Sequence, residues 1–61
     1  MKMYCVRVER ELENDYIFHF KWDNDIDPDR EYIEQLVYAE NINFKSGYDE
    51  FQYWEINIKS K

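Results

Sequence analysis

Residues 16–38 read YIFHFKWDNDIDPDREYIEQLVY, and the apolar period changes within this stretch. Over residues 16–22, aromatic side chains alternate with other types, which is the period of a β-strand with one buried face. Further along, Ile33, Leu36 and Val37 recur at spacings of three and four, as in an amphipathic helix. The stretch therefore predicts a strand, an acidic connection and a helix, in that order.

The start of the helix carries recognisable signals. Asp27 followed by Pro28 predicts an N-cap and a first helical residue, because Asp accepts backbone N–H bonds and Pro lacks an N–H of its own. Asp29 and Glu31 then suit the positive end of the helix dipole. We expect the helix to continue to about Glu40.

The residues that precede this stretch predict a hairpin. Residues 3–10 alternate in polarity, and residues 12–15 are polar enough for a turn. The strand at 3–10 should therefore pair with the one at 16–22. A register that opposes Val8 to Phe18 keeps the two apolar faces together.

The residues that follow the helix predict a second hairpin. Residues 42–44 should begin a third strand, and residues 45–50 contain the single glycine and should form the loop. Residues 51–59 alternate again and should form the fourth strand. The expected order is ββαββ.

The fold class that follows is α+β, with a four-stranded antiparallel sheet and one helix packed on one face. We expect residues 1–61 to form a single compact domain. The residues expected in its core are Tyr4, Val6, Val8, Phe18, Phe20, Trp22, Ile33, Leu36, Val37, Ile42, Phe44, Trp54, Ile56 and Ile58. The side chains expected on the uncovered face are those of Met3, Cys5, Arg7, Ile17, His19, Lys21, Phe51, Tyr53 and Glu55.

Length and composition limit how such a domain is held together. A chain of 61 residues buries only about 60% of the surface that its unfolded form exposes, which leaves its stability marginal, and a lone cysteine offers no disulfide. The twelve aromatic residues compensate, since each can bury roughly 150–250 Å². We find no signal peptide and no apolar run long enough to span a bilayer, so we expect a cytoplasmic protein, in the host cytoplasm if it is phage-encoded.

The charge distribution selects among classes of partner. The net charge is −6, and ten of the fourteen acidic residues lie between Glu9 and Glu34. This field repels nucleic acids and anionic membranes and attracts basic protein surfaces. We therefore expect no direct nucleic-acid or membrane partner. The same charge also serves solubility in a small domain.

The run from Asp23 to Glu34 resembles a calcium-binding loop in spacing, with carboxylates at relative positions 1, 3, 5 and 12. Position 6, however, is Pro28, where the loop needs glycine for a sharp turn. A predicted strand also precedes the run where an EF-hand has a helix. We therefore interpret the run as an acidic turn before a capped helix and expect no metal or other cofactor.

Catalytic residue types are scarce. Cys5 and His19 share a face of the predicted hairpin, but the expected register opposes Arg7 to His19 and supplies no orienting third group. A single glycine excludes a phosphate-binding loop. We therefore predict that the protein is not an enzyme.

The hypothesis that remains is a small acidic inhibitor or modulator that engages a basic surface of a larger protein. Its carboxylates could replace phosphates on a nucleic-acid-binding surface, as in a phage-encoded DNA mimic with an anti-defence role. The candidate partner-binding residues are Asp23, Asp25, Asp27, Asp29, Glu31, Glu34, Tyr38, Tyr48, Asp49 and Glu50.

The alternative is a small structural or assembly protein. The uncovered sheet face or an edge strand would then pair with a second copy to form a homodimer. The candidate self-association residues are Ile17, His19, Phe51 and Tyr53.

Overall fold

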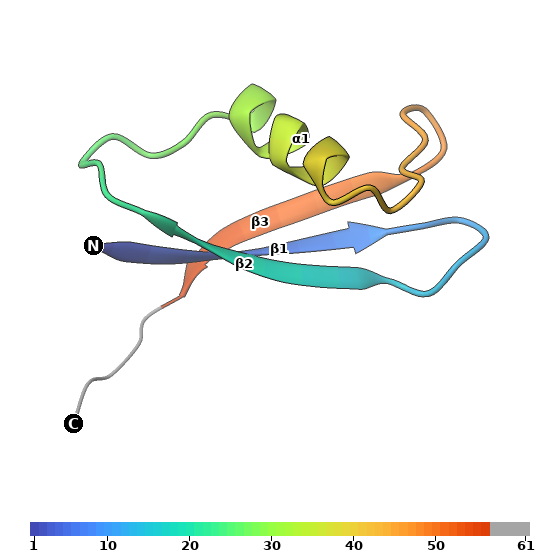
Figure 1. Cartoon of the computed structure of the whole chain (residues 1–61), viewed down its shortest axis with the longest axis horizontal. Helices are drawn as coiled ribbons and strands as arrows, with labels where there is room; N and C mark the ends of the chain where they lie inside the picture. The colour runs from blue at the N-terminus through green and yellow to red at the C-terminus, as the bar shows by residue number, and fades with distance from the viewer. Residues whose placement is uncertain (57–61) are drawn as a thin grey trace.

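A computed structural model describes residues 1–56 and shows an α+β arrangement of a three-stranded sheet and one helix (Figure 1). The expected order ββαββ is not confirmed, because the described residues form ββαβ. The elements are β1 (Lys2–Glu9), β2 (Tyr16–Trp22), α1 (Arg30–Ala39) and β3 (Glu50–Ile56).

The sheet has the order β2-β1-β3, and β1 pairs antiparallel with both neighbours. β2 and β3 therefore run in the same direction on either side of β1, and the connection through α1 crosses over the central strand. β1 carries the most buried side chains of the sheet, including Tyr4, Val6 and Val8. A central strand is enclosed on both edges, which explains this burial.

The predicted strand at residues 42–44 does not form. Asn41 and Asn43 have φ angles of 56° and 63°, in the left-handed region that interrupts an extended backbone. Ile42 lies between these two asparagines, and Phe44 follows the second. Both apolar side chains still pack against the core. These two apolar residues thus belong to a loop that closes the core.

The register of the hairpin differs from the expected one by two residues. Val6 opposes Phe18 and Tyr4 opposes Phe20, whereas we expected Val8 to oppose Phe18. A shift of two residues keeps every side chain on its face, so the apolar faces still meet. The face of the hairpin was predictable, but the pairing was not.

The facing of β3 is the reverse of the prediction. Phe51 is 4% exposed and packs in the core, and Tyr53 is half-buried beside it, whereas Trp54 is 42% exposed. The register explains the reversal, since Phe51 opposes Val8 and Tyr53 opposes the fully buried Val6. Our placement of Phe51 and Tyr53 on the uncovered face was therefore wrong. Ile58, also expected in the core, lies outside the described residues.

The core lies between the sheet and α1. Its tightly buried members are Val6 and Val8 from β1, Ile33 and Val37 from α1, and Phe51 from β3. The guanidinium of Arg30 lies 4.1 Å from the centre of the Phe51 ring and closes the core on that side. The partly buried side chains around it are those of Tyr16, Phe18, Phe20, Ile42, Phe44 and Tyr53.

We predict that Ile33→Ala lowers the free energy of unfolding by about 2–5 kcal/mol, because it leaves a cavity at a fully buried position. That loss is a large share of the stability of so small a domain. Urea unfolding followed by tryptophan fluorescence measures it. Gln35→Ala on the exposed side of α1 is the control and should change stability by less than about 0.5 kcal/mol. Equal effects of the two variants would contradict the described core.

Candidate functional site

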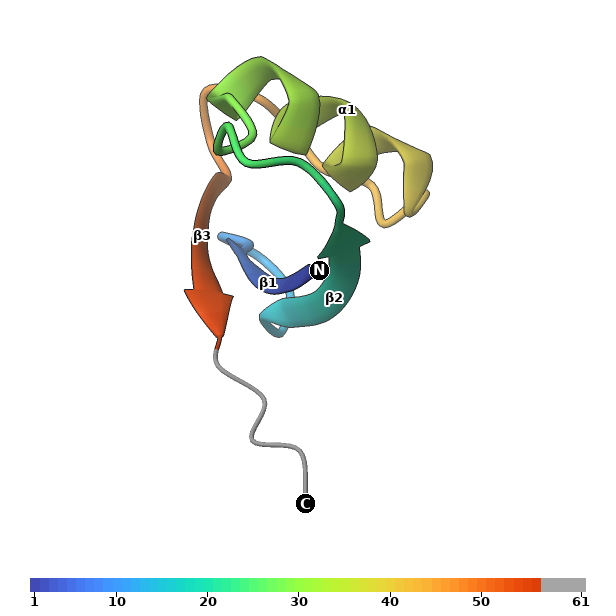
Figure 2. The same cartoon turned by 90° about the vertical axis from the view of Figure 1, so that its left-hand side faces the viewer.

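The acidic connection between β2 and α1 lies on the same side of the sheet as α1 (Figure 2). It is shaped by its own hydrogen bonds: the Trp22 indole Nε1–H donates to the carbonyl of Ile26 at 2.8 Å, and the Ile26 N–H donates to Asn24 Oδ1 at 2.9 Å. Pro28, which belongs to the same connection, is buried. The connection therefore has a defined shape that its own donors and acceptors maintain.

Asp27 anchors this connection to β1. Its Oδ1 accepts hydrogen bonds from the Tyr4 hydroxyl at 2.9 Å and from Lys2 Nζ at 3.3 Å. The bond from Tyr4, followed by the bond and charge of Lys2, lowers the pKa of Asp27. Burial and the bond to Asp27 raise the pKa of Tyr4 to about 12. Asp27 thus has a structural role within the chain.

Asp29 caps α1. Its Oδ1 accepts the backbone N–H of Tyr32 at 2.8 Å, and its carbonyl accepts the N–H of Ile33 at 3.2 Å. The prediction that Asp27 is the N-cap and Pro28 the first helical residue is therefore wrong by two positions. Both residues still precede the helix, where an Asp and a Pro are favoured.

Asp49 joins two loops at the opposite end of the sheet from this connection. Its carboxylate accepts the backbone N–H of Glu11 and that of Lys45, each at 3.0 Å. These backbone donors lower the pKa of Asp49. The β1–β2 loop and the segment before β3 are thereby tied together.

The other candidate partner-binding residues fall into separate groups. Asp23, Asp25 and Glu31 are exposed around the connection and the first turn of α1. Tyr48 lies in the loop before β3, and Glu50 opposes Glu9 at the far end of the sheet. The structure therefore does not unite the ten predicted residues on one surface.

Two further candidate residues lie along α1. Glu34 is half-buried. Tyr38 is 47% exposed, and its ring meets Phe44 edge to face at 5.5 Å between centroids. Tyr38 therefore helps to cover the Ile42–Phe44 loop.

Sequence reasoning missed two exposed apolar side chains beside the acidic group. Ile26, within the connection, is 76% exposed. Tyr32 is 42% exposed, and its ring lies 4.9 Å from that of Trp22. An apolar isoleucine is uncommon within a run of aspartates in a solvent-exposed turn. This sequence pattern could have identified Ile26.

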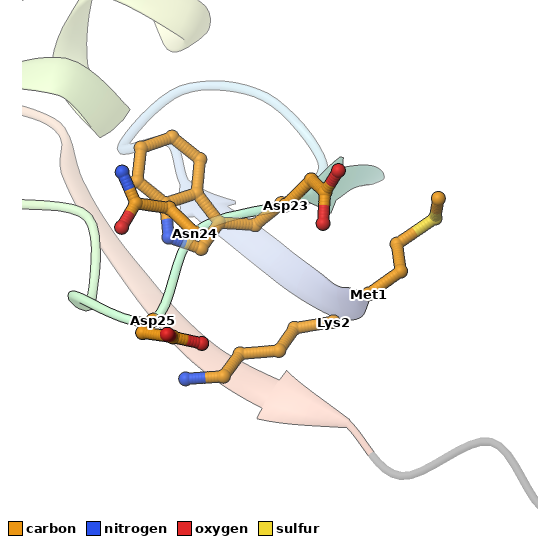
Figure 3. A pocket seen from close by; sticks show the side chains of 6 residues that line it. Met1, Lys2, Asp23, Asn24 and Asp25 are labelled. Carbon is orange, nitrogen blue, oxygen red and sulfur yellow. The ribbon is translucent and has the colours of Figure 1, made fainter.

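A hollow of about 400 Å³ lies between the connection and the start of β1 (Figure 3). Asp23, Asn24 and Asp25 line one part of it, and Met1 and Lys2 line another. Figure 3 shows the Lys2 side chain extending toward Asp25. The lining thus brings two carboxylates and one ammonium group together at this end of the sheet.

A second hollow, of about 580 Å³, separates the β1–β2 loop from the segment before β3. The Arg10 guanidinium crosses its base, donating to the carbonyls of Asn14 at 2.9 Å and Ile42 at 3.0 Å. Leu12 and Tyr48 are strongly exposed at its rim. Arg10 is thus committed to holding the two loops together.

Cys5 and His19 are direct cross-strand partners, so the expectation that Arg7 opposes His19 is wrong. Arg7 instead opposes Ile17, and its guanidinium pairs with Asp15 at 2.6 Å. Cys5 is 6% exposed, enclosed by its neighbours on the sheet. A thiol in that position has little room to attack a substrate.

Within residues 1–56, no helix combines the length and apolar character that a membrane crossing requires. Over the same residues, His, Cys, Asp and Glu form no group of three or more that could hold a metal ion. No family model, curated protein or solved structure matches the chain.

We predict an alkaline loss of stability that depends on Tyr4. Tyrosine in an unfolded chain ionises near pH 10, whereas Tyr4 in the folded chain has a pKa of about 12. The stabilisation is therefore fully present below about pH 10 and is lost as the pH rises through about 12. Urea midpoints measured across this window should fall less steeply for Tyr4→Phe than for the wild type. If the urea midpoints of Tyr4→Phe fell as steeply with pH as those of the wild type, the alkaline loss of stability could not be assigned to Tyr4.

We also predict an acid loss of stability that depends on Asp49. Its folded pKa is lowered, so its stabilisation is present above the unfolded value of about 3.9 and is lost as the pH falls through the folded value. Asp49→Asn should lower the thermal midpoint at pH 7 and flatten its decline below about pH 4. Asp25→Asn is the matched control at an exposed carboxylate and should follow the wild-type profile.

Proposed function

We propose that this chain is a small non-catalytic protein-binding module that engages a basic surface of a larger protein. The surface that carries the proposal, here called the acidic surface, consists of Asp23, Asp25, Ile26, Glu31 and Tyr32. The observation that supports it most is the combination of exposed carboxylates with exposed apolar side chains on a connection held by internal hydrogen bonds.

Preorganisation favours this surface over the other acidic groups. The carboxylates of Asp27 and Asp29 fix the connection to β1 and to the first turn of α1. The flanking side chains of Asp23, Asp25 and Glu31 are thus presented from a backbone that is already ordered. Binding then costs less conformational entropy than it would from a flexible acidic tail.

The chemistry of the surface matches a basic protein. Tyrosine and other large side chains supply most of the binding energy in protein interfaces, with polar groups around them. Tyr32 and Ile26 provide such a centre, and the carboxylates offer oxygen pairs to Arg and Lys. A partner rich in arginine around a shallow apolar depression fits this arrangement.

The class of partner that follows is a nucleic-acid-binding protein, whose Arg and Lys side chains ordinarily contact phosphates. Carboxylates at Asp23, Asp25 and Glu31 present anionic oxygens to the same donors. Occupation of that surface would inhibit or modulate the partner. A phage-encoded inhibitor of a host nuclease or defence protein is a role of this kind.

A competition experiment tests the proposal with a defined probe. A fluorescent DNA duplex is bound to a panel of basic DNA-binding proteins, and the chain is titrated in. For at least one protein we expect displacement that weakens with salt, because exposed charge pairs are screened. Neutralising the surface with Asp23→Asn, Asp25→Asn and Glu31→Gln should weaken the competition about tenfold or more.

The matched control variant has the same net charge as the variant with the neutralised acidic surface. Glu9→Gln, Glu11→Gln and Glu13→Gln also remove three negative charges, but from the far end of the sheet. This control should compete nearly as well as the wild type. Equal losses in the two variants would show a general charge effect and would contradict a defined acidic surface.

A further inference from the structure

The face of the sheet that points away from α1 has no second layer among residues 1–56 (Figures 1 and 2). The facing of β3 places Trp54 and Ile56 on it, with Met3, Cys5 and Ile17 from the other strands. Trp54 is 42% exposed and Ile17 is 55% exposed. This open face, as we call it, therefore has an apolar centre formed by side chains of all three strands, with His19 beside Cys5 within it.

Charge is distributed unequally along the open face. Lys21 stands beside Met3 at one end of the strands, where β2 leaves the sheet. Glu9 and Glu50 oppose each other at the other end, where β3 enters it. The two ends of the face thus carry opposite charge, with the apolar centre between them.

We propose that a second copy of this chain binds the open face, with a two-fold axis that lies between the sheets and perpendicular to the strands. Such an axis reverses the second sheet end for end. Lys21 of each copy then approaches the acidic end of the other, and the two apolar centres meet. The sheets pack about 10 Å apart, as in other sheet-on-sheet contacts.

The alternative two-fold axis, parallel to the strands, is disfavoured by the same residues. It would place Glu9 of one copy against Glu9 of the other across the axis. Like charges directly opposite each other destabilise an interface. The perpendicular axis avoids this repulsion between like charges, so the charge pattern selects one arrangement.

A second copy of the chain also fits the open face better than a strongly charged partner does. The net charge of the chain is −6, but on the open face Arg7 is neutralised by Asp15 at 2.6 Å. Lys21 offsets part of the charge of Glu9 and Glu50. The face is thus the part of the sheet where two copies of an acidic chain can approach with little repulsion.

The size of the face sets the expected affinity. Three short strands supply fewer residues than the roughly 20–30 per partner of a standard interface. We therefore expect a dissociation constant in the micromolar range. A value of 1 µM corresponds to a binding free energy of about −8 kcal/mol. The resulting dimer would present its two acidic surfaces outward and could bind a basic partner at two points.

Sedimentation velocity over about 1 µM to 1 mM tests the proposal, since a micromolar dissociation constant lies inside that range. An ionic strength of about 0.15 M screens the overall repulsion between copies. The wild type should pass from monomer to dimer. Trp54→Asp should remain monomeric, whereas Tyr38→Asp, at a similarly exposed aromatic on α1, should dimerise as the wild type does.

A charge exchange tests the direction of the axis. Lys21→Glu should weaken the dimer about tenfold, and the addition of Glu9→Lys to that variant should restore it. Circular dichroism verifies that each variant is folded. A wild type that stays monomeric to 1 mM, or a Trp54→Asp variant that still dimerises, overturns the proposal, and an unaffected Lys21→Glu dimer overturns the perpendicular axis.

Discussion

The contact of Ile33 and Val37 with Val6 and Val8 is the interaction on which the rest of the structure depends. All four side chains are fully buried, and each contributes about 1.5–3 kcal/mol through its removal from water. This contact fixes α1 above the central strand. The acidic connection must then pass over one end of the sheet, and the face opposite α1 is left uncovered.

The carboxylates divide into two kinds once this geometry is fixed. Asp27, Asp29 and Asp49 accept hydrogen bonds from Tyr4 and from backbone N–H groups, and they hold loops in place. Asp23 and Asp25 are exposed on one of those loops. A high acidic content therefore serves two purposes here, since some carboxylates build the loop from which others face solvent.

Two chemically different surfaces result from one small core. The acidic surface combines carboxylates with Ile26 and Tyr32, and the partner that we propose for it is rich in Arg and Lys. The open face is apolar at its centre and nearly balanced in charge, and the partner that we propose for it is a second copy of the chain. Because they lie on opposite sides of the sheet, one can be occupied without blocking the other (Figure 2).

The sequence alone determined the β-hairpin, the helix and the inward side chains of both. The alternation of Val6 and Val8 and the spacing of Ile33, Leu36 and Val37 are local patterns, so they could be interpreted without knowledge of the partners. The acidic connection was also predictable as a turn before a helix. Which of its carboxylates accept hydrogen bonds within the chain was not, because the bonds of Asp27 depend on contacts with β1.

Only the tertiary structure decided the facing of β3, the pairing register and the fate of residues 42–44. β3 carries large apolar side chains on both faces, so alternation could not choose between Phe51 and Trp54; pairing with β1 made the choice. Asn41 and Asn43 took left-handed conformations that let Ile42 and Phe44 reach the core from a loop. For β3 and for residues 42–44, the deciding contacts join segments far apart in the chain, which no local pattern records.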